Sequence, residues 1–441
     1  MSKTVRALGL FSVLCIGVNA IVGSGIYRLP GRIAHHLGGA SWAAFAVVGL
    51  LLVSVGLCFA EASGMFSASG GPYVYTREAF GRVPAFIVGW MAWITMVLSW
   101  GAVAHGVVGY LGALVTIDDP ILVHVVVAAM IVVPGALNYF GVKPGAYATN
   151  TFTLAKLVPL GAFVVLGIAY VDWGEVRAMP VVPEGGSVVA PFGAALFAAL
   201  FAVQGFEVAP VPAGETKNPR RNVPIAVIGS LVGCSIFYVL IQIIAYGTAP
   251  SIAGTAGVDE SWSARPLADA AQTFLGAPGV TLMSVGACIS MMGFCVGSAL
   301  ASPRFLGVLA EDRLFPSWLA ATHPRFGSPH HAIVATAGLT LLAGMLLDFD
   351  KLVDLANVAV TLQYVGTCVA VTWLRLKRPD LERSYRVPGG PFLMPLIGVG
   401  VCVLLLSQAA MAEFVFSGVV VIIGAVLAAI SMWVGRRVKG T

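Results

Sequence analysis

Residues 17–31 read GVNAIVGSGIYRLPG, and this stretch decides the fold. It belongs to an apolar segment long enough to cross a membrane, yet Gly23, Ser24 and Gly25 stand in its middle and Pro30 near its end. Each glycine in a helix interior costs about 1 kcal/mol relative to alanine, so a membrane helix can break here. Such a break is tolerated only where protein or a polar cavity surrounds the freed backbone groups. The stretch therefore predicts a broken helix beside a polar cavity.

The composition of the whole chain is that of a membrane protein. The 441 residues are 58% hydrophobic and 10% charged, and the mean hydropathy is +0.92, unlike a soluble globular domain. Apolar runs of about 20 residues, the length that spans a bilayer core, recur along the chain. We predict an all-α membrane protein with twelve transmembrane helices, and the continuous runs exclude a transmembrane β-barrel. The twelve are centred near residues 21, 53, 96, 131, 160, 203, 236, 292, 340, 364, 401 and 425.

The positive charges are distributed unevenly between the loops. With the N-terminus inside, nineteen of the 25 Lys and Arg residues fall on the inner side and five on the outer side, while Lys156 lies within a helix. The positive-inside rule therefore predicts a multi-pass protein of the cell membrane with both termini cytoplasmic. We interpret the inner loop at 375–386 as a basic, lipid-facing topology signal. The lipid bilayer is thus an expected partner and nucleic acid is not, and the first helix is expected to stay as an uncleaved anchor.

Residues that could perform enzyme or metal chemistry are sparse and scattered. The chain has no HExxH, GxSxG or Walker motif, and no paired carboxylates within one apolar span. Its histidines have no second ligand at metal spacing, and its seven cysteines fall in predicted spans without a CxxC pair. We therefore expect no enzymatic activity, no catalytic residue, no metal and no cofactor.

A second interruption lies in the sixth apolar span. Residues 191–213 read PFGAALFAALFAVQGFEVAPVPA, in which QGFE at 204–207 is followed by Pro210 and Pro212. The first helices of two five-helix sets are thus both interrupted, and an odd number of helices per set makes the sets insert with opposite orientation. Paired interruptions of this kind point to an inverted-repeat secondary transporter with a solute site near the membrane centre. The alternative is that these glycines only allow close packing of helices.

The paired interruptions also predict the domain organisation. A single transport domain of helices one to ten is expected over residues 1–390, with inverted repeats at about 8–175 and 190–378. Residues 391–441 are expected to append helices eleven and twelve and a short C-terminal tail.

Five stretches carry a resemblance to a known family. They are GSGIYRLPG (23–31), AEASGMFSASGGPYVYTREAFG (60–81), QGFE (204–207) followed by GETKNPRRNVP (214–224), ASPRFLGVLAEDRLFP (301–316) and LRLKRPDLERSYRVPG (374–389). In this order they resemble the amino acid–polyamine–organocation (APC) transporters, over nearly the whole chain. The resemblance implies a LeuT-type fold, a five-plus-five inverted repeat in which broken helices one and six hold one small amino acid or amine.

The ends of the two broken helices suit the two charges of a zwitterion. A half-helix that starts after Gly25 presents free N–H groups and the positive end of its dipole to a carboxylate, and Ser24 adds a hydroxyl donor. Half-helices that end near Ile21 and Gln204 present carbonyls to an ammonium. The resemblance implies that the amine binds the carbonyls of Ile21, Phe201 and Gln204 beside Gly205, and that the carboxylate binds Ser24, Gly25 and Ile26.

Two further positions bear on the choice of substrate. By resemblance, Phe201 occupies the place of an aromatic gate over the ligand, with ordinary core packing as the alternative. Some arginine or agmatine exchangers of the family carry a tryptophan on helix eight, where counting back from AEDRLFP places Ser298, with Phe294 one turn earlier. That difference favours neutral amino acids. Transport of cationic amino acids or polyamines stays the alternative.

Two ionisable residues within apolar spans are candidates for coupling, because such groups are costly in a bilayer and are usually functional. Lys156 matches a lysine of relatives whose ammonium replaces a sodium ion by binding carbonyls of helix one, which implies independence of sodium. It could also exchange a proton, or its ammonium could reach the lipid interface. Glu207 matches a carboxylate common in the family, with a role in proton sensing or in bonding the unwound backbone.

Taken together, the residues and the resemblance predict a sodium-independent secondary transporter of amino acids. It is expected to work by alternating access, as a proton symporter or an exchanger. Its expected partners are a small-molecule amino acid or amine and the lipid bilayer, with proton coupling as an option. A channel or a non-transporting solute sensor on the same fold is the alternative from a different functional class.

Overall fold

The computed structural model describes residues 6–117, 119–141, 146–178, 188–255 and 261–437. These residues are helical or lie in connections, apart from one isolated β-bridge between Leu8 and Thr216. The α-helices are α1 (Leu10–Ile21), α2 (Gly25–Leu37), α3 (Trp42–Met65), α4 (Pro72–Phe80), α5 (Arg82–Leu111), α6 (Pro120–Tyr139), α7 (Ala146–Gly167), α8 (Trp173–Arg177), α9 (Val189–Val203), α10 (Pro219–Thr248), α11 (Pro266–Leu275), α12 (Ala277–Glu311), α13 (His330–Leu346), α14 (Phe349–Lys377), α15 (Leu393–Leu406) and α16 (Met411–Arg437). Short 3₁₀-helices are η1 (Gly38–Ser41), η2 (Ile168–Tyr170), η3 (Phe206–Val208), η4 (Ala213–Glu215), η5 (Pro250–Ala253) and η6 (Ser317–Ala320). Lys3, Lys143 and Lys439, which entered the charge count, and the tail at 438–441 lie outside the described residues.

The described residues include nine helical stretches that are long and apolar enough to cross a membrane. Three shorter apolar helices, α1, α13 and α15, accompany them. One of the nine stretches runs from α2 through η1 into α3, so the second half of the broken first helix continues into the next span. The predicted all-helical class is confirmed, whereas the number of twelve spans and the inverted repeat stay predictions.

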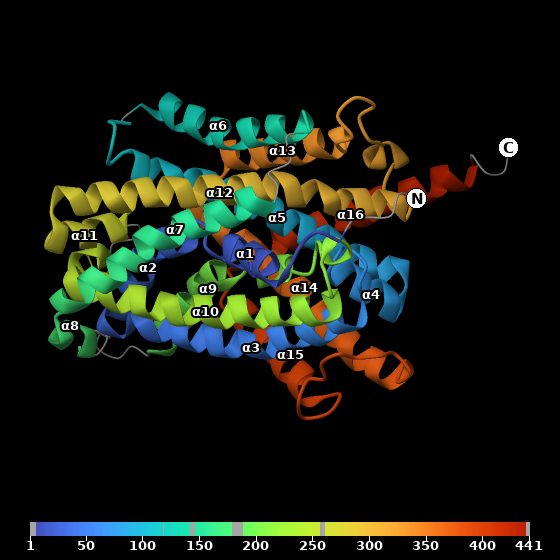
Figure 1. Ribbon diagram of the computed structural model, residues 1–441, viewed down its shortest axis with the longest axis horizontal. Helices are drawn as coiled ribbons and strands as arrows, with labels where there is room; N and C mark the ends of the chain where they lie inside the picture. The colour runs from blue at the N-terminus through green and yellow to red at the C-terminus, as the bar shows by residue number, and fades with distance from the viewer. Residues whose placement is uncertain (1–5, 118, 142–145, 179–187, 256–260, 438–441) are drawn as a thin grey trace.

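The long helices run side by side in one bundle (Figure 1). Within it α5 packs against α12 and α14, α3 packs along α10, and α1 contacts α7, α10 and α12. The C-terminal end of α16 lies at the same end of the bundle as α4 and the α14–α15 loop, whereas α8 and α11 lie at the opposite end (Figure 1). The centrally placed α1 is short, because the glycine cluster at 23–25 interrupts it.

The first interruption separates α1 from α2. The helix α1 ends at Ile21 and α2 begins at Gly25, so residues 22–24 connect the two. These are the ends that the glycine cluster predicts, because glycine has little intrinsic preference for a helix interior. Pro30 stays inside α2 without ending it. Proline at this sixth position of α2 has no N–H to donate to the Ile26 carbonyl, so the helix continues with one intrahelical hydrogen bond missing.

The second interruption begins at the predicted QGFE stretch. The helix α9 ends at Val203, and only the 3₁₀-helices η3 and η4 follow before α10. Gly205 has φ +124°, a backbone conformation that side-chain-bearing residues rarely adopt. Pro210 and Pro212 lack the N–H groups that a continuing α-helix would require. The chain therefore crosses this region in tight turns.

The two interruptions contact each other at the centre of the bundle. A Cβ atom added to Gly25 would lie 2.6 Å from the Cα atom of Ala202 in α9. One added to Gly205 would lie 2.6 Å from the carbonyl carbon of Ala20 in α1. Both distances are shorter than real Cβ contacts, so these approaches require glycine. The chain thus brings two irregular segments, far apart in the sequence, to one place.

Candidate functional site at the helix breaks

A cavity of about 310 Å³ lies beside the two breaks, with walls from α1, α5, α9, α12 and the irregular segment after α9. Most of the predicted site residues line it, and so do Phe294 and Ser298 of α12. The predicted residues in its wall are Ile21, Ser24, Gly25, Phe201, Gln204, Gly205 and Glu207. Ile26 and Lys156 do not line it, and both are fully buried.

The start of α2 presents free hydrogen-bond donors. Among the described residues, the amides of Ser24, Gly25 and Ile26 have no hydrogen-bond acceptor. The first turn of any helix leaves such N–H groups unpaired, and the positive end of the helix dipole lies with them. The Ser24 hydroxyl is buried and also has no partner in the described chain. This end of the cavity can therefore hold an anionic group such as a carboxylate.

The carbonyls at the ends of α1 and α9 differ in whether they already accept hydrogen bonds. The Gly205 amide donates to the Glu207 carboxylate at 2.8 Å, which leaves the Phe201 carbonyl without the helical bond it would otherwise accept. The Ile21 carbonyl already accepts from the Tyr238 hydroxyl at 3.2 Å and from a backbone amide at 2.9 Å. An ammonium can therefore bind the Phe201 carbonyl without competition, whereas at Ile21 it would have to share the oxygen.

The charged side chains in the cavity wall all have partners. Glu207 accepts from the Gly205 amide and from the Tyr364 hydroxyl, the latter at 2.9 Å. Glu215 and Arg304 form an ion pair at 3.3 Å. That pair lines the same end of the cavity as Leu8, whose amide donates to the Glu215 carbonyl at 3.0 Å. The described wall therefore offers no unpaired charge to a ligand.

Side-chain contacts cover the opposite end of the cavity. Phe201 packs edge-to-face against Phe349 of α14, with ring centroids 6.3 Å apart. Beyond these rings, Arg32 of α2 forms ion pairs with Asp350 at 2.9 Å and with Asp354 at 3.1 Å. These contacts tie α2 to α14 across that end. The lining of the cavity thus includes Phe201, whose ring packs against Phe349, and extends in the other direction as far as Glu215.

Lys156 lies behind the first break rather than in the cavity. Its ammonium donates to the carbonyl of Val22 at 2.6 Å and to that of Asn19 at 3.3 Å. Ser290 of α12 donates to the same Val22 carbonyl at 3.2 Å. The Lys156 side chain has no exposed surface, so its ammonium does not reach the lipid interface. It joins α7 to the end of α1, where the helix dipole is negative.

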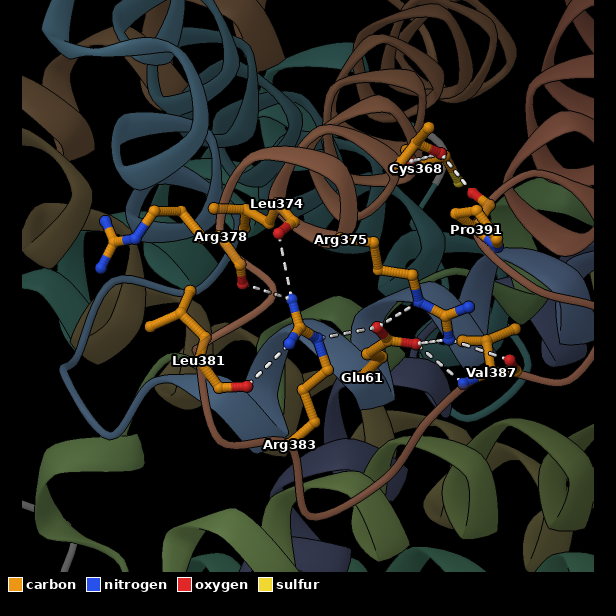
Figure 2. Close-up of polar contacts among 10 residues, drawn as sticks. Glu61, Cys368, Leu374, Arg375, Arg378, Leu381, Arg383, Val387 and Pro391 are labelled. Atoms are coloured by element: carbon orange, nitrogen blue, oxygen red, sulfur yellow. Dashed lines mark hydrogen bonds and ion pairs between the residues drawn. The ribbon is translucent and has the colours of Figure 1, made fainter.

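A second buried carboxylate, outside the cavity, was not assigned a role from the sequence. Glu61 of α3 is fully buried and binds Arg375 of α14 through both carboxylate oxygens, with a contact of 2.6 Å to Nε. Figure 2 shows that two groups of the α14–α15 loop reach the same carboxylate, the Val387 amide at 2.7 Å and Arg383 Nε at 3.5 Å. A buried carboxylate needs such partners, because desolvation penalises an unpaired charge.

This cluster corrects one interpretation made from the sequence, that the basic loop at 375–386 faces lipid. Instead the side chain of Arg383 is 3% exposed and that of Arg375 is 13% exposed, because both turn inward to Glu61. A carboxylate within an apolar span, followed by basic residues in a distant loop, is the signal that could have indicated the pairing.

Comparison with known proteins identifies the family. The profile of a family described as amino acid permease matches residues 8–426. The chain is 29% identical to the branched-chain amino acid permease BcaP of Bacillus subtilis (strain 168), over 91% of this chain and 87% of that protein. It is 28% identical to the serine/threonine exchanger SteT of the same organism, over 98% and 97%, and 27% identical to that organism's methylthioribose transporter, over 90% and 87%. The chain is thus a multi-pass membrane protein, and it belongs to the amino acid permease family of the APC superfamily.

Proposed function

We propose that this protein is a secondary transporter that carries a neutral amino acid by alternating access. One observation carries the proposal: the unpaired amides of Ser24, Gly25 and Ile26 and the unpaired carbonyl of Phe201 belong to two broken helices that meet beside one cavity. A zwitterionic α-amino acid has one charge for each kind of group. The relatives named above are permeases, exchangers and transporters, which supports transport rather than enzymatic chemistry.

The charges around the cavity support a neutral substrate over a cationic one. The Glu207 carboxylate is occupied by the Gly205 amide and the Tyr364 hydroxyl, and Glu215 is paired with Arg304. A cationic side chain in this cavity would lose water without gaining a free carboxylate, which is unfavourable. We therefore propose that the substrate side chain is uncharged.

The proposed architecture is a ten-helix core of two inverted repeats, at about 8–175 and 190–378. The helices α15 and α16, within residues 391–441, are appended to it. Both termini are placed in the cytoplasm by the charge distribution, so the end of the cavity at Glu215 faces inward. The contacts beyond Phe201 then close the outer side, and the structure corresponds to an inward-facing state.

The proposed energy coupling is independent of sodium. The Lys156 ammonium takes the place that a cation would occupy at the end of α1, where backbone carbonyls would otherwise lack donors. Proton symport and exchange both fit this arrangement. The Glu207 carboxylate accepts a hydrogen bond from the Gly205 amide. Protonation of this carboxylate would therefore change the hydrogen bonding at the second break.

Uptake by proteoliposomes that contain the purified protein tests the proposal. We expect saturable uptake of a neutral radiolabelled amino acid, and counterflow when the unlabelled amino acid is loaded inside. Conductance without saturation would instead indicate a channel. Binding seen as a ligand-dependent rise in thermal stability, without uptake, would indicate a sensor. Either of these two results overturns the proposal.

A further inference from the structure

Three buried side-chain oxygens in the cavity wall have no hydrogen-bond partner among the described residues. They are Oγ of Ser24, Oδ1 of Asn19 and Oε1 of Gln204. The relative exposure of these residues is 0%, 6% and 6%. Buried polar atoms are nearly always hydrogen-bonded in native proteins, so three exceptions around one cavity call for partners that enter it. The cavity is therefore built for a ligand with more than one polar group.

The three oxygens do not have the same surroundings. Ser24 stands with the free amides at the start of α2, so the proposed carboxylate accounts for it. The side-chain amide of Asn19 donates to the Gly293 carbonyl at 3.3 Å, which ties that residue to α12. Gln204 differs from both, because its side-chain nitrogen meets the Ser99 hydroxyl of α5 at 3.4 Å and its oxygen stays free.

Gln204 and Ser99 form a polar pair in a largely apolar part of the wall. Met96 and Val103 lie on either side of Ser99 along α5, and Phe294 contributes from α12. A glutamine amide can both donate and accept, and so can a serine hydroxyl. Neither group carries a charge. Their natural partner on a ligand is a hydroxyl or a carboxamide.

We propose that Gln204 is a specificity-determining residue. Together with Ser99, its side chain binds a hydrogen-bonding group on the substrate side chain and favours neutral polar amino acids such as serine, threonine or asparagine over branched aliphatic ones. This inference rests on the proposed function, and it concerns the Gln204 side chain rather than its backbone carbonyl.

The direction of the preference depends on whether the bound substrate gives the Gln204 oxygen a hydrogen-bond partner. A polar side chain gives the Gln204 oxygen a partner in place of water. An aliphatic side chain displaces that water and leaves the buried oxygen unpaired. A site built to hydrogen-bond its substrate rejects analogues that lack the polar group more strongly than an apolar pocket rejects a missing methylene.

The test compares the specificity constants for threonine and valine, which have similar shapes and differ by a hydroxyl. The wild-type protein in proteoliposomes is expected to favour threonine by about tenfold or more. Gln204→Leu should reduce this ratio at least tenfold, through slower threonine transport and unchanged or faster valine transport. Ser99→Ala should shift it in the same direction. The matched control is Gln408→Leu, which lies between α15 and α16 and should leave the ratio unchanged.

Each outcome bears on the inference. A wild-type preference for valine overturns it, and so does a Gln204→Leu ratio within twofold of wild type. If Gln204→Leu does not fold, Gln204→Met replaces it and is judged by the same ratio. Absence of uptake for every amino acid tested would overturn the proposed function itself. Uptake without the predicted ratio would overturn only the role of Gln204.

Discussion

The ammonium of Lys156 lies 2.6 Å from the carbonyl oxygen of Val22, the residue directly after the last turn of α1. A break in a membrane helix exposes carbonyls at the negative end of its dipole, and these need a cation or hydrogen-bond donors. Here a side chain of α7 supplies both. The break is therefore compensated from within the protein, by a side chain that joins α7 to α1.

The first prediction concerns sodium. Replacing sodium by potassium or choline on both sides of the membrane should leave the initial rate of uptake unchanged, because the Lys156 ammonium already binds the carbonyls at the break. Measured uptake in the three salts checks this at constant ionic strength. A steep, saturable dependence on external sodium would refute the assignment of Lys156.

The second prediction concerns removal of that charge. Lys156→Met should lower uptake by at least tenfold, because the Asn19 and Val22 carbonyls lose a buried charged donor. The matched control is Lys351→Met, at an exposed position in the first turn of α14. Uptake at equal protein density compares the two variants. Wild-type rates for Lys156→Met would show that its contact with α1 has no role in transport.

The third prediction concerns the contact between the two breaks. The sequence led us to expect that Gly25→Leu abolishes uptake with folding largely intact. The 2.6 Å approach to Ala202 adds a second effect, because any Cβ forces α2 away from α9. Even Gly25→Ala should lower both uptake and stability, the latter by about 1–3 kcal/mol. Uptake and thermal unfolding measured on the same samples check both expectations.

The control for that experiment is Gly161→Ala, in α7. A Cβ added at Gly161 would have no neighbour within 4 Å, so alanine should be tolerated there and should stabilise the helix by up to about 1 kcal/mol. If Gly25→Ala behaved like Gly161→Ala, the close packing of the breaks would have no functional consequence.

The fourth prediction concerns Glu61. Removing one partner of a buried ion pair costs about 3–5 kcal/mol, so Glu61→Gln and Arg375→Met should each lower the stability of the purified protein strongly. Glu382→Gln is the control, because its ion pair with Arg220 is exposed and should contribute about 0–1 kcal/mol. Midpoints of thermal unfolding compare the three. Equal midpoints for Glu61→Gln and Glu382→Gln would contradict this account.

The fifth prediction concerns topology. A cysteine at Arg378, which is exposed in the α14–α15 loop, should react in intact cells only with membrane-permeant reagents, and one at Lys351 should react with impermeant reagents. Labelling of position 378 from outside would reverse the proposed orientation. The sequence alone suggests cysteines near Arg221 and Arg383 as inner probes and near Glu260 as the outer one. Arg383 is buried against Glu61, and Glu260 lies outside the described residues.

Local features of the molecule could be predicted from the sequence. The ends of α1 and α2 follow from the glycine cluster, because the preference of glycine against helix interiors acts within a few residues. A cavity beside Ser24 and Gly205 could be inferred from the paired breaks, whereas the place of Phe201 in it was implied by the family resemblance. These inferences needed no knowledge of tertiary packing.

Features that depend on distant partners could not be predicted. Glu61 and Arg375 are separated by 314 positions, and a carboxylate in an apolar span does not specify which distant basic residue it pairs with. The occupation of the Ile21 carbonyl by Tyr238 likewise depends on how α10 packs against α1.

The anchoring of the α14–α15 loop limits the insertions and deletions that this loop can accept. Surface loops usually accept insertions and deletions, because little depends on their length. Here Arg375, Arg383 and the Val387 amide all contact the Glu61 carboxylate. The segments between these three residues must therefore have lengths that allow each of them to reach it. Deleting one residue between Arg375 and Arg383 would draw the second guanidinium away from Glu61 without altering any side chain. In this loop the spacing between residues is under constraint as well as their identity.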